Sequence, residues 1–293
     1  MKSVKLNTGH SMPIIGLGTY LIKDKDTIME VVRASLESGY RAFDTAELYE
    51  NEHHLGEAFE KFLPQFKLKR EDIFITSKLA TNNQGAEKAP KAIQETLDNL
   101  RTPYLDLFLI HWPGVQDLNE DDPQNREIRT QSWKCMEQAH LNGKLRAIGV
   151  SNYTVKHLNE MLDPNSPYHC KVVPAVNQVE FHPYLYQKEL LEYCNQKGIR
   201  LEAYSSLGSQ KSQDLLKDEK VALIAKNHGK SVAQVLLRWA VQHEIIIIPK
   251  SSKADRVKDN IKIFDFELSS QDMETLDGLN KNLRYSWDPS KVF

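Results

Sequence analysis

Residues 38–80 read SGYRAFDTAELYENEHHLGEAFEKFLPQFKLKREDIFITSKLA, and this stretch decides the fold. Two short runs that favour strand, 42–44 and 73–77, flank residues 52–62, where apolar side chains recur at helical spacing. Strand, helix and strand in this order predict a parallel βαβ unit. Gly39, just before the first run, suits the left-handed cap of a preceding helix because glycine has no Cβ.

The same alternation repeats along the whole chain. After a hairpin predicted from residues 3–6 and 11–14, eight strands are expected at 15–18, 42–44, 73–77, 105–110, 146–150, 175–178, 200–204 and 245–248. Helices are expected at 27–38, 52–62, 89–100, 130–142, 155–161, 188–196, 231–242 and 254–261. Eight units without a linker rich in Pro, Gly or Ser favour one α/β domain over residues 1–293, a (β/α)8 TIM barrel with an N-terminal β-hairpin.

An open dinucleotide-binding sheet is the competing fold. It requires a GxGxxG motif after the first strand, whereas Gly16-Leu17-Gly18 is followed by Thr19-Tyr20-Leu21, so the third glycine is missing. In a barrel the catalytic residues lie at the C-terminal ends of the strands. Those ends are therefore the places to search for chemistry.

Composition and charge exclude several classes of function. A formal net charge of -2 gives no basic excess, so neither nucleic acid nor an anionic membrane is an expected partner. The three cysteines, Cys135, Cys170 and Cys194, show no CxxC pair and predict reduced thiols rather than disulfides or a zinc site. The first residues lack the apolar core of a signal peptide, which predicts a cytoplasmic protein, and nothing demands an interface, so we expect a monomer.

Ionisable side chains follow three of the predicted strands. Asp44 ends one strand, Tyr49 lies one turn further on, Lys78 ends the next strand and His111 ends the third. Each has an ordinary structural explanation: Asp44 could cap a helix, Tyr49 could be a core aromatic, Lys78 could lie on the surface and His111 could be a packed histidine.

Together, the four residues interlock chemically at one mouth of the barrel. A phenol has a pKa of about 10, so Tyr49 gains as a proton donor from a cation that stabilises its phenolate. Lys78 can be that cation, and Asp44 supplies the counter-charge that keeps it protonated. A neutral His111 can orient a substrate carbonyl. The set lacks a reductant, so a cofactor must bring the hydride.

The sequence also resembles the aldo-keto reductase family. Seven of its segments are similar to the family's signatures and occur in the family's order: DTAELY, ITSKL, LIHWP, GVSNY, NQVEFHP, AYSSLGS and IPKSS. The resemblance implies a (β/α)8 barrel, NADPH as cofactor without a Rossmann motif, and Asp44, Tyr49, Lys78 and His111 as the catalytic tetrad. It implies an alcohol:NADP+ oxidoreductase that reduces aldehydes and ketones, with Tyr49 as proton donor.

The resemblance assigns further residues to the cofactor. Ser151, Asn152 and Gln178 would bind the nicotinamide carboxamide, and Tyr204 would stack on the ring. The complete expected cofactor set is Thr19, Tyr20, Asp44, Ser151, Asn152, Gln178, Tyr204, Ser205, Leu207, Ser209, Lys250, Ser251, Ser252, Arg256 and Asn260. Of these, Lys250, Ser251, Ser252 and Arg256 would hold the 2′-phosphate, which implies a preference for NADPH over NADH. Glu180 and His182 match family positions that we expect to be structural.

The segments that shape the substrate pocket are short compared with those of large family members. Residues 112–131, 208–221 and 287–293 leave little room for a lid. We therefore predict an open pocket walled by Tyr20, Tyr49, His111 and Trp112, with broad specificity for small carbonyl compounds. A non-catalytic NADPH-binding barrel with a structural or regulatory role remains the alternative. A metal-dependent hydrolase lacks a cluster of His and carboxylate ligands at the strand ends.

Overall fold

The computed structural model describes residues 2–208 and 213–293. Its strands are short, and those of the barrel are almost completely buried. A hairpin precedes them, formed by β1 (Ser3–Lys5) and β2 (Ser11–Pro13). The barrel strands are β3 (Leu17–Gly18), β4 (Ala42–Asp44), β5 (Phe74–Leu79), β6 (Leu107–Ile110), β7 (Ile148–Ser151), β8 (Val176–Glu180), β9 (Arg200–Tyr204) and β10 (Ile246–Ile247).

These eight strands form one parallel sheet in sequence order from β3 to β10. Parallel bridges from Ile15 to Ile247 and from Gly18 to Lys250 join its two edges. The predicted (β/α)8 barrel is thereby confirmed. Because all strands run in the same direction, their C-terminal ends gather at one mouth, where the site is expected.

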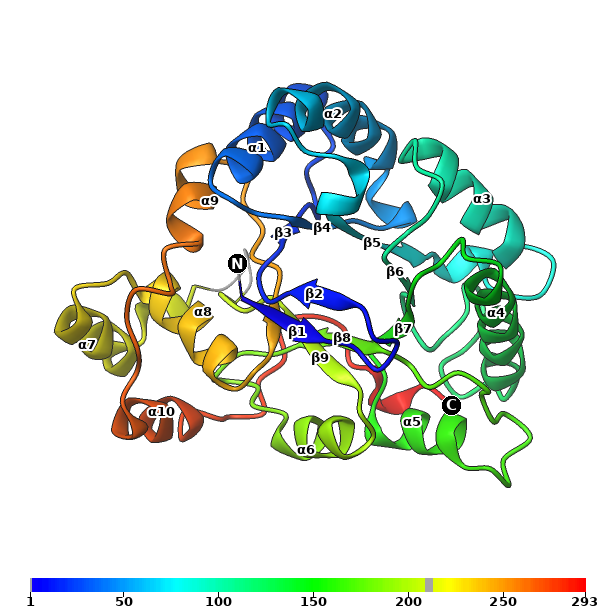
Figure 1. Cartoon of the computed structure of the whole chain (residues 1–293). Coiled ribbons are helices and arrows are strands. Elements are labelled where there is room, and N and C mark those ends of the chain that lie inside the picture. Colours follow the sequence, from blue (N-terminus) through cyan, green and yellow to red (C-terminus); the bar gives the residue numbers. More distant parts are fainter. Residues whose placement is uncertain (1, 209–212) are drawn as a thin grey trace.

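The helices surround the sheet as a ring (Figure 1). They are α1 (Lys25–Glu37), α2 (Glu52–Gln65), α3 (Ala89–Asn99), α4 (Gln124–Leu141), α5 (Val155–Leu162), α6 (Lys188–Gln196), α7 (Glu219–His228), α8 (Val232–Gln242), α9 (Ala254–Asn260) and α10 (Ser270–Asp277). Side chains cap several of their N-termini; Asp24, for example, accepts a hydrogen bond from the backbone N–H of Thr27. Gly39 adopts a φ of 94°, as its position before a strand predicted.

The helix predictions miss two elements and misplace the start of a third. α7 has clear end signals, since Asp218 accepts from the backbone N–H groups of Lys220 and Val221, and Gly229 closes the helix in the left-handed region. α10 has a capping box formed by Ser269 and Asp272. α4 starts at Gln124 rather than at the expected residue 130, so the segment after Trp112 is more helical than predicted.

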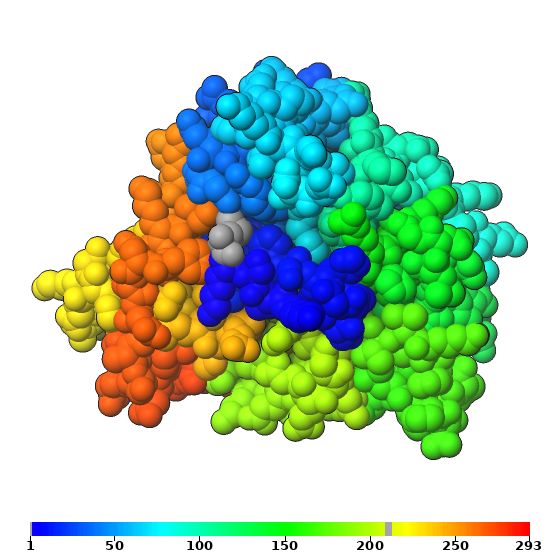
Figure 2. All heavy atoms as spheres, in the orientation of Figure 1, coloured from blue at the N-terminus to red at the C-terminus, as the bar shows by residue number. Residues whose placement is uncertain are grey.

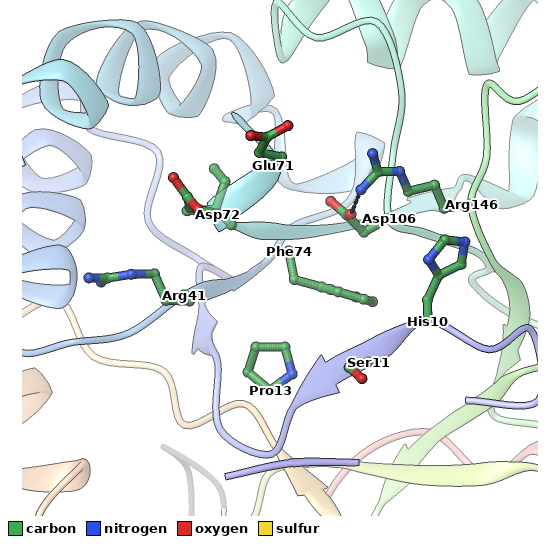
Figure 3. Close-up of a pocket in the computed structure, with 10 residues that line it drawn as sticks. His10, Ser11, Pro13, Arg41, Glu71, Asp72, Phe74, Asp106 and Arg146 are labelled. Atoms are coloured by element: carbon green, nitrogen blue, oxygen red, sulfur yellow. Dashed lines mark hydrogen bonds and ion pairs between the residues drawn. The ribbon is translucent and has the colours of Figure 1, made fainter. Parts of the chain in front are cut away.

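The N-terminal hairpin covers the end of the barrel opposite the predicted site (Figures 1 and 2). Asn7 donates to the carbonyls of Val173 and Pro174, just before β8. A small cleft remains between the hairpin and the starts of β5, β6 and β7; His10, Phe74, Asp106 and Arg146 are among its lining residues (Figure 3). Within the described part of the chain, no helix is long and apolar enough to cross a membrane.

Candidate active site

The structure brings the four predicted catalytic residues together. Asp44 ends β4, Lys78 lies in β5, Tyr49 closes the 3-10 turn η1 (Glu47–Tyr49), and His111 directly follows β6. The Lys78 ammonium donates to Asp44 Oδ1 at 2.8 Å and to the carbonyl of Thr45 at 2.8 Å. It also lies 3.3 Å from the hydroxyl of Tyr49. The tetrad is thus a connected cluster centred on one buried cation.

The charges of this cluster hold one another in place. Burial alone would lower the pKa of Lys78, but Asp44 and Tyr49 offset it and leave that pKa above its usual value. The side chain of Lys78 is 0% exposed and that of Asp44 is 3% exposed, so water contributes little to either charge. Burial also raises the pKa of Asp44, and the contacts with Lys78 and Gln178 oppose that rise, so Lys78 stays protonated with Asp44 as its counter-charge.

Tyr49 departs from one part of the expectation. Burial raises the pKa of Tyr49 to about 12, and the nearby Lys78 only partly opposes this rise. The cation therefore limits the cost of forming the phenolate without bringing the pKa below its ordinary value. The phenol carries its proton throughout the neutral range, which suits a proton donor.

His111 is held as a neutral imidazole beside Tyr49. Their ring centroids are 5.7 Å apart in an edge-to-face arrangement. Burial, together with the charge of Lys78, lowers the pKa of His111 well below its usual value. Its Nδ1 is buried and has no hydrogen-bond partner among residues 2–208 and 213–293. The ring can therefore direct a hydrogen bond to a substrate oxygen without adding a charge.

Four residues expected at the nicotinamide form a second connected group beside the tetrad. Tyr204 at the end of β9 donates to Asn152 Oδ1 at 2.7 Å, and Asn152 Nδ2 donates to the backbone carbonyl of His111 at 3.0 Å. Ser151 donates to the backbone carbonyl of Gln178 at 2.9 Å. Asn152 has a φ of 66°, a left-handed conformation that asparagine tolerates better than most residues. Strands β7, β8 and β9 thus present amides, a hydroxyl and an aromatic ring at one mouth.

The residues expected near the first strand also lie at this mouth. Thr19 is buried and donates through its hydroxyl to the carbonyl of Asp44 at 2.8 Å. Tyr20 is 44% exposed, and its ring centroid lies 5.1 Å from that of Tyr49. Ser205 and Leu207 follow β9, whereas Ser209 lies outside the described residues.

The residues expected at the 2′-phosphate cluster after β10. Lys250 bridges to Gly18, which places it next to Thr19, and Ser251 is fixed by a hydrogen bond from its hydroxyl to the carbonyl of Lys253. The group also includes exposed Ser252 and Arg256 and buried Asn260. Burial lowers the pKa of Lys250. Neither Lys250 nor Arg256 forms an ion pair with a described residue, so both cations are available to an anion.

Of the predicted substrate walls, Trp112 borders a hollow at the surface. A hollow of about 290 Å³ lies next to Trp112 and is also lined by Thr81, Val115, Leu118 and Val292. Leu48, next to Tyr49, is 48% exposed. Polar side chains, among them Gln116, Glu120 and Asn125, line the same hollow, so its wall is mixed rather than apolar.

The sequence reasoning did not single out two acids that lie near the tetrad, the buried Glu202 and the half-buried Glu47. Glu202 in β9 accepts a hydrogen bond from Gln178. Glu47 accepts from the backbone N–H of Ala80, and burial raises the pKa of Glu47 to about 7. Glu180 was expected to be structural, and it accepts from the backbone N–H groups of Tyr285 and Ser286, which fits that expectation. A signal existed for Glu202, because an acid inside a predicted barrel strand is unusual.

Comparison with known proteins defines the class. The Aldo/keto reductase family profile matches residues 14–281. The chain belongs to the aldo-keto reductase family, and its class is that of the carbonyl-reducing oxidoreductases.

Individual relatives are similar over nearly their full length. The chain is 43% identical over 290 residues to a glyoxal reductase of Bacillus subtilis, covering 99% of this chain and 97% of that protein. It is 39% identical over 300 residues to aldo-keto reductase family 1 member A1 of Mus musculus, covering 97% and 90%. The aldose reductase structure from Schistosoma japonicum matches with a TM-score of 0.87 at 39% identity, covering 97% of this chain and 94% of that one.

Proposed function

We propose that this protein reduces small aldehydes, ketones and dicarbonyls to alcohols, with NADPH as hydride donor and Tyr49 as proton donor. The main observation in support is that the fully buried Lys78 ammonium contacts both Asp44 and the Tyr49 hydroxyl. A fully buried lysine beside a half-buried tyrosine is costly for stability. Its arrangement is explained by a reaction in which a phenolate must form briefly.

The residues at the mouth suit the cofactor. Gln178, Ser151 and Asn152 would bind the carboxamide of the nicotinamide, and Tyr204 would lie against its ring. Lys250 and Arg256 would hold the 2′-phosphate. When bound, NADPH supplies the hydride that the protein's own side chains lack.

The tetrad then handles the proton. His111 donates a hydrogen bond to the carbonyl oxygen and orients it toward Tyr49. As the carbonyl carbon gains a hydride, the oxygen takes the proton of Tyr49, and the resulting phenolate lies beside Lys78. Asp44 keeps Lys78 protonated throughout, so that the cation is present when the negative charge develops.

The substrate class follows from the mouth and from the relatives. Exposed Tyr20 and Leu48 and the hollow beside Trp112 leave the entrance open, which suits small and varied carbonyl compounds. The glyoxal reductase named above acts on a small dicarbonyl, as its name states. We therefore expect dicarbonyls and small aromatic aldehydes to be turned over faster than a bulky steroid ketone.

The test is NADPH consumption with a panel of these carbonyl compounds, measured in parallel with NADH. Tyr49→Phe should lower kcat by about 10²–10⁴-fold and leave the Kd for NADPH nearly unchanged, because the phenol contributes a proton rather than the main cofactor contacts. Tight NADPH binding without turnover of any carbonyl would instead support a non-catalytic barrel. Sharp selectivity for the steroid would contradict the open pocket.

A further inference from the structure

A fully buried acid lies beneath the expected nicotinamide site and has no role in the reaction above. Glu202 lies in β9, two residues before Tyr204, and its side chain is 0% exposed. A buried acid lowers the stability of the fold unless neighbouring groups form hydrogen bonds or ion pairs with it. Its contacts therefore need an explanation.

Glu202 contacts the cofactor site through one residue, Gln178. The side-chain nitrogen of Gln178 donates to Asp44 Oδ2 at 2.8 Å and to Glu202 Oε2 at 2.9 Å. A primary amide has only two N–H donors, so these acids use both. The amide oxygen of Gln178 is therefore the group left to bind a ligand. The amide cannot flip without cost, because the flip would place this oxygen against the oxygens of two acids.

The surroundings of Glu202 favour its neutral form. Lys78 on β5, whose charge acts on Glu202, directs its three N–H donors at Asp44, Thr45 and Tyr49 instead. The remaining oxygen of Glu202, Oε1, is buried without a hydrogen-bond partner in the described part of the chain. Ile246, its neighbour on β10, is apolar. This oxygen lacks a partner in either form, and a buried charge without a partner costs more than a neutral group without one.

Electrostatics agree with this geometry. Burial first, and the negative charge of Asp44 second, raise the pKa of Glu202 to about 8, with Gln178 and Lys78 only partly opposing them. Burial raises the pKa of Asp44 as well, but Asp44 accepts directly from the Lys78 ammonium and Glu202 does not, so below that pH the negative charge lies on Asp44 and the proton on Glu202. Above it, Glu202 adds a second negative charge.

We propose that Glu202 is a positioning residue that keeps a proton at neutral pH, holds the Gln178 amide with its oxygen toward the nicotinamide carboxamide and, when it ionises, favours the oxidised cofactor. The proposal rests on the proposed function, because it requires the nicotinamide to bind at Gln178. The oxidised ring is cationic and the reduced ring is neutral, so a new carboxylate behind Gln178 stabilises NADP+ selectively. By reciprocity, bound NADP+ makes Glu202 release its proton more readily.

The experiment is fluorescence titration of the full-length protein with NADP+ and with NADPH, from about pH 6.5 to about pH 9.5. In the wild type, the ratio Kd(NADP+)/Kd(NADPH) should fall by about fivefold as pH rises through about 8. The ratio of the two Kd values cancels any protonation that affects both cofactor forms equally, such as that of Lys250 at the proposed phosphate site. Glu202→Gln should remove the step and keep the neutral-pH Kd for NADPH within about twofold, because its amide oxygen still accepts from Gln178.

Two further variants separate positioning from general damage. Glu202→Leu leaves one N–H of Gln178 unpaired and should weaken both cofactor forms by about tenfold, a loss that the Gln variant does not show. Glu47→Gln changes another acid near the tetrad, a half-buried one that accepts from Ala80 and Asn83 rather than from Gln178, and should retain the step.

The outcomes distinguish the two proposals. If the wild type binds neither cofactor form, the proposed function fails. If it binds both and the ratio stays flat, or if Glu202→Gln keeps the step, cofactor binding stands and the role of Glu202 is refuted. Should the Leu variant not fold, the comparison of wild type with Glu202→Gln still decides.

Discussion

Neutralising Asp44 should destabilise the fold as well as the reaction. Asp44→Asn keeps the shape of the side chain but leaves the buried ammonium of Lys78, 2.8 Å away, without its counter-charge. Breaking a buried pair by removing one charge costs roughly 3–5 kcal/mol. Because Lys78 keeps its contacts with Thr45 and Tyr49, we expect the lower end, a loss of about 3 kcal/mol in the free energy of unfolding. Lys78→Met should cost a similar amount, since it leaves a buried carboxylate held mainly by Gln178.

The double variant isolates the interaction between the two charges. With Asp44→Asn and Lys78→Met combined, no charge of this pair remains buried, so the loss should fall short of the sum of the single losses by about 2–3 kcal/mol. Urea unfolding followed by circular dichroism on all four proteins measures this coupling. Losses that simply add would show that the pair is not coupled as described. Enzyme activity cannot measure this coupling, because every variant in the cycle should have lost most of its activity.

Three shorter predictions concern the phenol, the cofactor and the barrel wall. Burial raises the pKa of Tyr49 to about 12, so the phenol keeps its proton below that value and loses it only as pH rises through it. The tyrosinate absorbance of the wild type, after subtraction of that of Tyr49→Phe, should therefore stay near zero up to about pH 11. Arg256→Ala should raise the KM for NADPH by about tenfold and change that for NADH little, and equal effects on both would argue against a 2′-phosphate contact. Gly149→Ala would place a Cβ 2.5 Å from the carbonyl of Val176 and 2.8 Å from Leu109, and should lower the free energy of unfolding by about 2–3 kcal/mol; an unchanged thermal midpoint would contradict this packing.

The strand pattern could be predicted well because burial on both sides leaves a clear apolar signal. Strands 42–44 and 200–204 have the expected limits, and the others differ by a few residues at their ends. Helix α7 was missed although Asp218 and Gly229 mark its ends, because it is an additional element outside the regular strand–helix alternation. α10 was missed for the same reason. An argument from repetition finds the repeating units and overlooks additions to them.

The tetrad could be predicted because strand order alone brings the ends of β4, β5 and β6 to one mouth. The pKa of Tyr49 could not be predicted from the sequence. Its value depends on the balance between the burial of the ring, which raises the pKa, and the nearby Lys78, which lowers it. The role of Glu202 could not be predicted for a related reason, because its contacts come from distant parts of the chain. Its partner Gln178 is 24 positions away in the chain, and Asp44 is a further 134 positions from Gln178.

The hydrogen bond from Gln178 to Asp44 shows what these polar residues do inside the barrel. β8 and β4 are not neighbours in the sheet, so this bond crosses the barrel interior. A TIM barrel is normally filled with apolar side chains in layers. Here the interior near the mouth holds Asp44, Lys78, Gln178 and Glu202, joined by direct hydrogen bonds. Apolar residues of similar volume would stabilise the fold at least as well. The layer is therefore best explained by the proposed reaction, because its fixed bonds link the proposed proton donor to the proposed nicotinamide site. A change of charge at either end would then be felt at the other.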